Sequence, residues 1–390
     1  MKVLYISHTS EMQGSGRAVL NIMLQMKEKG VDVSIILPTG YGGLFDEIKN
    51  HTIKYTAIKS ALYIWPNTSS LRNLCLFPYR LIRFFIRKYN FDIQLTNAVN
   101  AYKPDIIHTN VGVIHTGHYV AKKMKIPQVW HIREYQDLDF RWKPYPSKNK
   151  YLQLLTHKNN YPVSITNGVY QHHSLERNKN SQVIYDGVFD KKIMPEINTQ
   201  KKKYFLFVGL VSEGKGTDEA IQGFISIAKE IPTYELWIAG GGSLQYIESL
   251  KKQCKQSGIG ERIKFLGHRT DVDHLMSEAI ALIVASKFEG FGFITAEAMF
   301  NGCLVIGRDS AGTKEQFDNG FKMQGEEIGL RYKTTLQLST ILKEIANNGI
   351  GPYLHMIRLA QETAVNLYSS QQNADKIYEL YNMILLEHGD

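Results

Sequence analysis

Short apolar runs that alternate with helical patterns are the feature that most constrains the fold of this chain. The runs are brief, rich in β-branched residues and bounded by turn or polar residues, which is typical of buried strands. In the first half they are Val3–Ser7, Val31–Leu37, Asp105–Asn110, Gln128–His131, Pro162–Thr166 and Gln182–Tyr185. Between the first two, Val19, Ile22, Met23 and Met26 recur at helical spacing. This alternation predicts an α/β fold, with a parallel sheet and helices on both faces.

The same alternation restarts after a polar, basic segment at residues 191–203, which we interpret as a linker. The later strands are predicted at Tyr204–Val208, Tyr234–Ala239, Arg262–Leu266, Ile280–Ala285 and Leu304–Gly307. The 390 residues therefore divide into domains at 1–190 and 204–367, followed by a helical segment at 368–390. Open α/β sheets bind ligands at the carboxyl ends of their strands, so we expect one deep cleft between the two domains.

Composition excludes several classes of protein. Hydrophobic residues make up 43% and charged residues 21%, which disfavours disorder, collagen and a membrane bundle. The 46 basic and 37 acidic residues give a net charge of +9, which indicates an anionic partner. Three scattered cysteines predict a reducing, cytoplasmic location. We expect the first residues to form a strand rather than a signal peptide, and no apolar run is long enough for a membrane-spanning helix.

Three glycine-rich turns follow predicted strands. Gly14-Ser15-Gly16-Arg17 opens the first helix but lacks the third glycine of a dinucleotide fingerprint. Such a turn lets a ligand approach a helix N-terminus, and it equally suits a tight strand-to-helix connection. The turn at Gly240 allows close approach by a ligand or by another backbone.

The remaining turn, Gly209 to Lys215, matches the start of a P-loop. The next residue should be Ser or Thr to hold magnesium, yet it is Gly216, and the hydroxyl is displaced to Thr217. This displacement argues against a nucleotide triphosphatase. Lys215 beside a helix start still suits a diphosphate, and the alternative is a solvated lysine in a turn.

The strongest functional pattern is a strand that runs into a loop with a carboxylate and two glycines. A helix begins near Ile294, and its free amides can hold a phosphate without a metal. Glu297, in the first turns of this helix, can accept hydrogen bonds from both hydroxyls of a ribose. Glu289 can hold sugar hydroxyls on the other side of that phosphate. The alternative is an ordinary loop with an acidic residue near a helix start.

The stretch from Glu289 to Glu297, with seven residues between the glutamates, resembles the E-x7-E motif of family 4 glycosyltransferases, also called glycosyl transferases group 1. The resemblance extends over nearly the whole chain. Its further motifs are Gly14-Ser15-Gly16, Pro104-Asp105-Ile106-Ile107-His108, Val129-Trp130-His131, Ile184-Tyr185-Asp186-Gly187, Ser286, Gly290-Phe291-Gly292, Gly302, Gly312-Thr313-Lys314-Glu315, Tyr368-Ser369 and Tyr378–Leu385.

The resemblance implies the GT-B fold, in which two Rossmann-like, doubly wound domains face each other across a deep cleft. The N-terminal domain would bind the acceptor and the C-terminal domain the nucleotide sugar, and the last helix would pack back on the N-terminal domain. The implied reaction is retaining transfer of a hexosyl or N-acetylhexosaminyl group from a nucleotide-diphosphate sugar, with UDP-sugar favoured over GDP-sugar. The acceptor would be a glycan or lipid-linked saccharide of polysaccharide or cell-envelope biosynthesis. No cofactor and no metal are expected.

The resemblance also assigns roles to residues. His131 and Glu289 would be catalytic, with His131 approaching the sugar and Glu289 positioning it. Gly14 and Arg17 would lie on the acceptor side. The donor would be bound by Gly16, Gly209, Lys215, Gly240, His268, Gly290, Phe291, Gly292, Phe293, Ile294 and Glu297.

Three positions depart from the family pattern. Leu210 stands where the family has an arginine that supplies a second cation to the diphosphate. Cys303 stands where proline is common and Asp186 where asparagine is common, and we interpret both changes as structural. Phosphate binding would then depend more on Lys215 and on backbone amides, with Arg17 or another basic group as a further contributor.

Other functions are less consistent with the sequence. The pairs Asp137-Leu138-Asp139 and Asp271-Val272-Asp273 mimic a metal-binding D-x-D motif, but neither ends a strand, so we interpret both as surface pairs. No nucleic-acid-binding module is present, and no nucleic-acid partner is expected. A GT-B nucleotide-sugar epimerase and a catalytically silent binding subunit remain alternatives.

Residues 71–90 raise a question about membranes. Five basic residues interleave there with apolar ones, which predicts a basic amphipathic helix after Pro78. We favour the interpretation that its apolar side packs in the core and its arginines form a solvated rim. The alternative is peripheral contact with an anionic surface, on the inner face of the cytoplasmic membrane.

Overall fold

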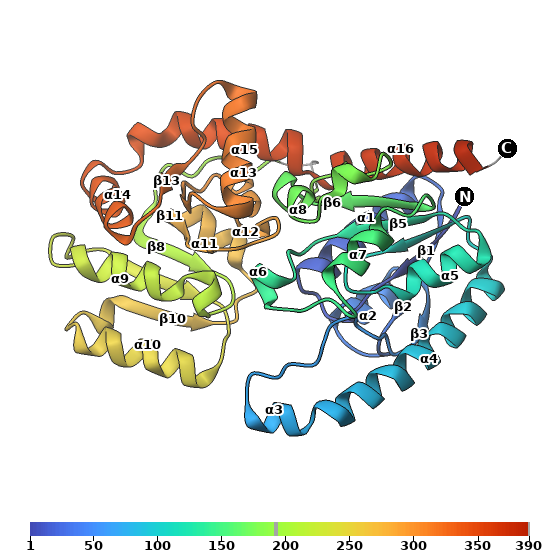
Figure 1. The fold of residues 1–390 in the computed structure, drawn as a ribbon. Helices are drawn as coiled ribbons and strands as arrows, with labels where there is room; N and C mark the ends of the chain where they lie inside the picture. Colours follow the sequence, from blue (N-terminus) through green and yellow to red (C-terminus); the bar gives the residue numbers. More distant parts are fainter. Residues whose placement is uncertain (191–193, 389–390) are drawn as a thin grey trace. The chain divides into compact units, whose positions relative to one another are not determined.

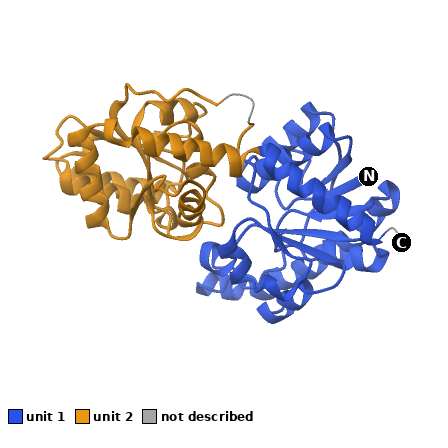
Figure 2. Cartoon of the chain, turned by 90° about the horizontal axis from the view of Figure 1, so that it is seen from above, with its two compact units in different colours: residues 1–187, 370–390 blue, residues 188–369 orange. Residues whose placement is uncertain are grey.

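The computed structural model describes residues 1–190 and 194–388, which form two compact units (Figures 1 and 2). Unit 1 comprises Met1–Gly187 and Ser370–Asp390, and unit 2 comprises Val188–Ser369. The sequence placed these boundaries at 190 and 368. Of the expected linker, residues 191–193 lie outside the described residues, and Lys202 and Lys203 already belong to a strand of unit 2.

Unit 1 is built on a seven-stranded parallel sheet in the order β3-β2-β1-β4-β5-β6-β7. Its strands are β1 (Lys2–Ile6), β2 (Asp32–Leu37), β3 (Lys54–Ala57), β4 (Ile106–Thr109), β5 (Gln128–Ile132), β6 (Asn160–Ser164) and β7 (Gln182–Val183). Its helices are α1 (Gly14–Glu28), α2 (Gly43–Asn50), α3 (Leu71–Cys75), α4 (Phe77–Tyr102), α5 (Thr116–Met124), α6 (Asp137–Phe140), α7 (Lys148–Leu155), α8 (Asn167–His172) and α16 (Ser370–His388).

Helices cover both faces of this sheet (Figure 1). On one face, the apolar side of α1 packs with α16 against β1. On the other, the last turns of α4 pack with α5 against the same strand. Helix α16 therefore completes the core of unit 1 although it follows unit 2 in the sequence, as the resemblance implied. Its buried residues are Ile377, Leu380, Tyr381 and Ile384.

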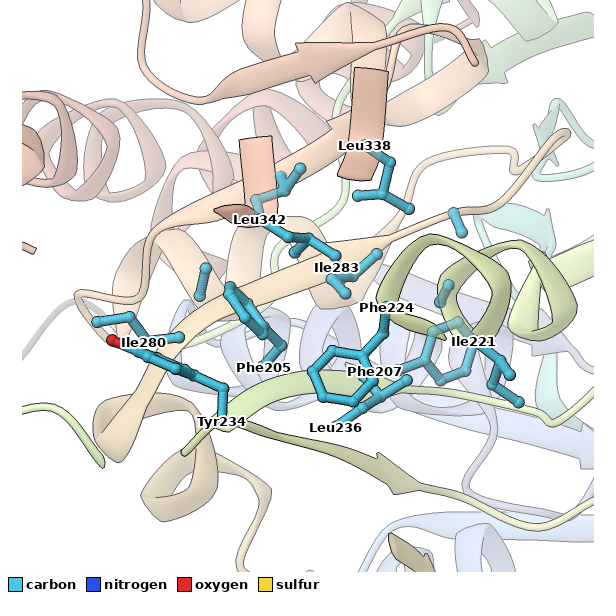
Figure 3. Packing of buried hydrophobic residues seen from close by; sticks show 14 of the residues in the cluster. Phe205, Phe207, Ile221, Phe224, Tyr234, Leu236, Ile280, Ile283, Leu338 and Leu342 are labelled. Atoms are coloured by element: carbon cyan, nitrogen blue, oxygen red, sulfur yellow. The ribbon is translucent and has the colours of Figure 1, made fainter. Parts of the chain in front are cut away.

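Unit 2 repeats the plan with a six-stranded parallel sheet in the order β10-β9-β8-β11-β12-β13. Its strands are β8 (Lys202–Val208), β9 (Glu235–Ala239), β10 (Ile263–Gly267), β11 (Ala279–Val284), β12 (Val305–Arg308) and β13 (Leu330–Tyr332). Its helices are α9 (Thr217–Ile227), α10 (Leu244–Gln256), α11 (Val272–Glu278), α12 (Phe293–Phe300), α13 (Ala311–Gln324), α14 (Thr335–Asn348) and α15 (Leu354–Tyr368). Figure 3 shows Phe205, Phe224 and Leu342 among the side chains of its core.

The expected α/β architecture is confirmed, but two edge strands were missed. All four residues of β3 are exposed, so this strand has no apolar run to reveal it. Strand β13 has only three residues, and one of them is buried. Both strands are edges whose pairing depends on the neighbouring strand rather than on their own pattern.

The favoured interpretation of residues 71–90 was wrong. The core-facing residues of α4 are Phe91, Leu95 and Val99, which recur every fourth residue in its second half. Earlier in α4 and in α3, no residue is fully buried. Several large apolar side chains there are exposed: Leu71, Leu74, Tyr79, Ile82, Phe85, Ile86 and Tyr89. Within residues 1–190 and 194–388, no helix is long and apolar enough to span a membrane.

Unit 1 also buries several histidines against aromatic rings. His115 stacks between Tyr63 and Tyr151, with ring centroids 4.4 and 5.2 Å away. Burial lowers the pKa of His115 to about 3, and it lowers the pKa values of His118 and His173 to about 4. These rings are therefore neutral in the native protein at neutral pH.

These histidines predict an acid-sensitive unit 1. Below about pH 6.5 they take up protons in the unfolded state but not in the folded one, so stability falls as pH decreases toward about 4. Each contributes up to about 1.4 kcal/mol per pH unit. Burial has the opposite effect on three carboxyl groups, because it raises the pKa of Glu134 to about 7 and also raises the pKa values of Asp139 and Asp186. The lowered pKa values of three further buried histidines, His8, His108 and His131, add to the loss at low pH.

Hydrogen exchange of the intact protein, corrected for intrinsic exchange rates, tests the predicted acid sensitivity of unit 1. Unit 1 peptides should lose protection between about pH 7 and pH 5. Unit 2 is the internal control because its three histidines, His268, His274 and His355, are exposed. Equal losses in both units would contradict the account.

Candidate functional site

Two glycine turns lie at the carboxyl ends of β8 and β9. Gly209 and Gly240 have φ angles of 145° and 146°, which L side chains rarely adopt. A Cβ on Gly240 would lie 1.8 Å from the carbonyl oxygen of Gly209. The turns therefore pack backbone against backbone, which requires glycine at both φ angles and leaves no room for a side chain at residue 240.

The turn that carries Lys215 packs against the end of β11. Gly216, with φ 70°, follows Lys215, and a Cβ there would lie 2.2 Å from the carbonyl oxygen of Ala285. The displaced hydroxyl of Thr217 contacts the backbone N–H and C=O of Ser212, at 3.3 and 3.4 Å. This hydroxyl closes its own turn, which supports the interpretation that the segment is no P-loop.

Lys215 and Glu289, predicted separately from two motifs, form an ion pair. Lys215 Nζ lies 2.7 Å from Glu289 Oε1, and the side chains are 34% and 17% exposed. The second carboxylate oxygen, Oε2, is buried and has no hydrogen-bond partner among the described residues. The structure thus places a cation and a carboxylate together at the carboxyl edge of the unit 2 sheet, where phosphate and hydroxyl groups can bind.

The loop from Gly290 to Gly292 leads into α12, which begins at Phe293, one residue before the predicted start. Gly292 has φ 91°. Gln316 holds the loop from behind, because its Nε2 donates to the carbonyl oxygens of Phe291 and Gly292 at 2.7 and 3.0 Å. Glu297 is half-buried on the second turn of α12. The helix N-terminus and both motif glutamates therefore belong to one buttressed segment.

Unit 1 has a corresponding turn between β1 and α1. Gly14 is exposed and begins α1, while Gly16 is buried with its Cβ position 2.1 Å from the carbonyl oxygen of Glu11. Asn110, directly after β4, donates to the carbonyl oxygen of Ser15 at 2.8 Å. This bond fixes the glycine turn to the sheet. Arg17 is half-buried on the first turn of α1.

His131, on β5, is fully buried in a hydrogen-bonded chain. Its Nδ1 lies 3.2 Å from His108 Nε2 and 3.3 Å from Arg133 Nη2. His108 Nδ1 lies 2.5 Å from the hydroxyl of Tyr381 on α16, and that hydroxyl lies 3.0 Å from the hydroxyl of Tyr5. Burial, Arg133 and His108 together hold the pKa of His131 well below its usual range, so the ring is neutral.

These contacts fix which nitrogen of His131 carries the proton. Because a guanidinium can only donate, Nδ1 must accept, and the proton of the neutral ring lies on Nε2. His108 then donates from Nε2 and accepts from Tyr381 at Nδ1. The His131 Nε2 is buried without a hydrogen-bond partner among residues 1–190 and 194–388. The neutral His131 ring can therefore donate a hydrogen bond from Nε2 but cannot act there as a base.

Arg133 is itself held by Asp186. The two side chains form a buried ion pair, and Arg133 Nε also donates to Asn110 at 2.9 Å. Burial raises the pKa of the Asp186 carboxyl, and contact with Arg133 opposes that rise. The sequence missed the roles of His108, Asn110 and Arg133. Their only signal is that each lies near the carboxyl end of a predicted strand or just beyond it.

Comparison with known proteins follows the same division. The family Glycosyltransferase Family 4 matches residues 12–188, and Glycosyl transferases group 1 matches residues 189–330. The chain belongs to the family 4, group 1 glycosyltransferases.

Individual relatives agree. The lipopolysaccharide core biosynthesis mannosyltransferase LpsB of Rhizobium meliloti is 27% identical over 38% of this chain, but the match spans only 45% of that relative. The N-acetyl-alpha-D-glucosaminyl L-malate synthase of Bacillus anthracis is 22% identical over 79% of this chain and 78% of its own length. The structure of Anabaena HepE in complex with UDP covers 98% of this chain and 100% of that one, with a TM-score of 0.77 and 16% identity. The GT-B fold is confirmed.

The next residues are those near the position where the family has an arginine. Leu210, at the place of the family arginine, is 59% exposed, and His268 is exposed after β10. Arg308 does not replace that arginine, because Glu219 engages it with both carboxylate oxygens at 2.5 and 2.6 Å. Lys287 is exposed, and its backbone N–H donates to the carbonyl oxygen of Gly214.

The acidic pairs have structural partners in this glycosyltransferase. Asp271 pairs with Arg269, and Asp273 accepts from Asn301 at 3.1 Å. Asp137 pairs with His172, at 2.7 Å, and Asp139 accepts from the Tyr135 backbone. Within the described residues, no group of three His, Cys, Asp or Glu side chains could hold a metal ion.

The proton position on His131 can be measured. In the intact protein with ¹⁵N-labelled histidine, we expect the Nδ1 resonance of His131 in the unprotonated range and Nε2 in the protonated range. Both should stay unchanged as the pH falls through the usual histidine pKa of about 6.5, because the pKa of His131 lies well below that value. His131→Gln assigns the signals among the 13 histidines. A proton on Nδ1 would contradict the derived chain.

Proposed function

We propose that this protein transfers a sugar from a UDP-sugar to a hydroxyl of a glycan or lipid-linked saccharide. The observation that carries the proposal is the Lys215–Glu289 ion pair, in which the buried Oε2 of Glu289 has no hydrogen-bond partner among the described residues. Glu289 directly precedes the glycine-containing loop that leads into α12. A diphosphate and a sugar need one cation and one carboxylate in adjacent positions. The UDP complex of the HepE structure and the LpsB relative support a nucleotide-sugar donor and a role in polysaccharide or cell-envelope biosynthesis.

Each side chain then has a chemical task. Lys215 neutralises charge that develops on the diphosphate, assisted by the amides at the start of α12. Glu289 accepts hydrogen bonds from sugar hydroxyls, and Glu297 accepts them from the ribose. His131 donates its Nε2 hydrogen to a substrate hydroxyl. Arg133 and His108 keep that hydrogen in place through their contacts with Nδ1.

The proposed reaction proceeds on one face of the sugar, with retention of its anomeric configuration and without a metal. The bond between the anomeric carbon and the diphosphate oxygen breaks, and the electron pair leaves with UDP. The acceptor oxygen forms the new bond on the same face. Its proton passes to the departing phosphate, so no protein base is needed. The electrostatic environment that stabilises the diphosphate supplies the main rate enhancement.

Donor binding tests the proposal without knowledge of the acceptor. In a thermal-shift panel, UDP-glucose or UDP-N-acetylglucosamine should raise the unfolding temperature more than GDP-mannose or ADP-glucose. Glu297→Ala should weaken this response.

Sugar transfer is a separate test of the site. Glu289→Ala should keep UDP binding but abolish transfer of labelled sugar into a lipid or polysaccharide fraction. Neither Mg²⁺ nor EDTA should change the rate of transfer by the wild type. Glu213→Ala, an exposed carboxylate in the Lys215 turn, is the matched control. Unchanged transfer by Glu289→Ala, or inhibition by EDTA, would contradict the site.

A further inference from the structure

Helix α4 exposes an apolar stripe that no described part of unit 1 covers. Ile82, Ile86 and Tyr89 recur at helical spacing and are 61%, 56% and 66% exposed. We define the stripe as these residues together with Leu71, Leu74, Tyr79, Phe85 and Ile93, all of which are exposed. On the opposite side of α4, Phe91, Leu95 and Val99 face the core. Soluble monomers rarely expose so continuous an apolar surface, which indicates an interaction site.

Three arginines lie beside the stripe on the same helix. Arg80, Arg83 and Arg87 are spaced by three and four residues, and they line a hollow of about 270 Å³. The other lining residues are Ser60, Ala61, Leu62, Ile64 and Phe84. None of the three arginines has an ion-pair partner among the residues that the structure describes. Three unneutralised guanidinium groups around one hollow are suited to phosphate.

The distribution of charge on α3 and α4 restricts the class of partner that this surface can bind. In α3 and α4 the first carboxylate is Asp92, and Lys88 pairs with it at 3.0 Å. The exposed half of this segment is therefore cationic and apolar at once. Nucleic acid would satisfy the arginines but would gain nothing from Ile82 and Ile86. A bilayer with anionic lipids satisfies both, since its phosphates meet the arginines and its acyl boundary takes the apolar side chains.

We propose that α3 and the first half of α4 form a docking surface for an anionic phospholipid membrane, with a lipid phosphate held by Arg80, Arg83 and Arg87. Figure 1 shows α3 and the start of α4 at the outer edge of unit 1, away from its sheet. The tyrosines Tyr79 and Tyr89 suit the boundary between head groups and hydrocarbon. The docking surface would give the transferase proposed above a membrane partner. The evidence for the surface comes from α3 and α4 alone.

Vesicle flotation of the full chain tests the proposal. We expect binding to phosphatidylcholine vesicles that contain phosphatidylglycerol and little binding to phosphatidylcholine alone. Arg80→Gln/Arg83→Gln/Arg87→Gln should weaken binding on the order of 100-fold. Ile82→Ser/Ile86→Ser should also weaken it while leaving the charge unchanged. Both variants change exposed or half-buried side chains, and circular dichroism checks their folding.

A charge-matched control separates this surface from general attraction. Lys122→Gln/Lys123→Gln/Lys158→Gln removes the same charge from exposed positions elsewhere in unit 1, and it should bind nearly as wild type. An equal loss in this control, or no binding of the wild type to anionic vesicles, would overturn the proposal. The thermal response to UDP-glucose, measured on the same variants, should be unchanged. A loss of vesicle binding is thereby distinguished from a failure of the proposed transferase function.

Discussion

The buried ion pair between Arg133 and Asp186 is the interaction on which the carboxyl edge of the unit 1 sheet depends. It joins the end of β5 to the last residues of the unit before Val188, and both partners are almost fully buried. Removing one partner of such a pair leaves an uncompensated charge and costs about 3–5 kcal/mol. Arg133 also holds Asn110 and His131, so the glycine turn and His131 share one anchor.

The candidate site residues of the two units differ in their chemistry. In unit 1, burial keeps His131 neutral, and the contacts at Nδ1 leave one hydrogen to donate. In unit 2, the partly exposed Lys215 pairs with Glu289, and the backbone turns at Gly209 and Gly240 pack against each other at the same edge of the sheet. In the proposed reaction, the first arrangement would orient a substrate hydroxyl and the second would stabilise negative charge. Together these are what sugar transfer from a diphosphate donor requires.

Local pattern predicted most of the strands and the loop and helix that carry Glu289 and Glu297, because buried strands and helix starts depend on neighbours in sequence. It did not predict the exposed edge strand β3, whose pairing is set by β2. Nor could it reveal the contact of His108 with Tyr381, which lies 273 residues away. The amphipathic pattern of residues 71–90 was found, but which side faces solvent depends on tertiary packing. Periodicity identifies an apolar side without saying what covers it.

The central claim is that Lys215 binds the diphosphate of the donor. Isothermal titration of UDP and UMP against the wild type and Lys215→Ala tests it most directly, since the two ligands differ only in the second phosphate. The account predicts that the wild type prefers UDP strongly and that Lys215→Ala loses most of this preference while retaining its affinity for UMP. An undiminished preference for UDP in Lys215→Ala would contradict it.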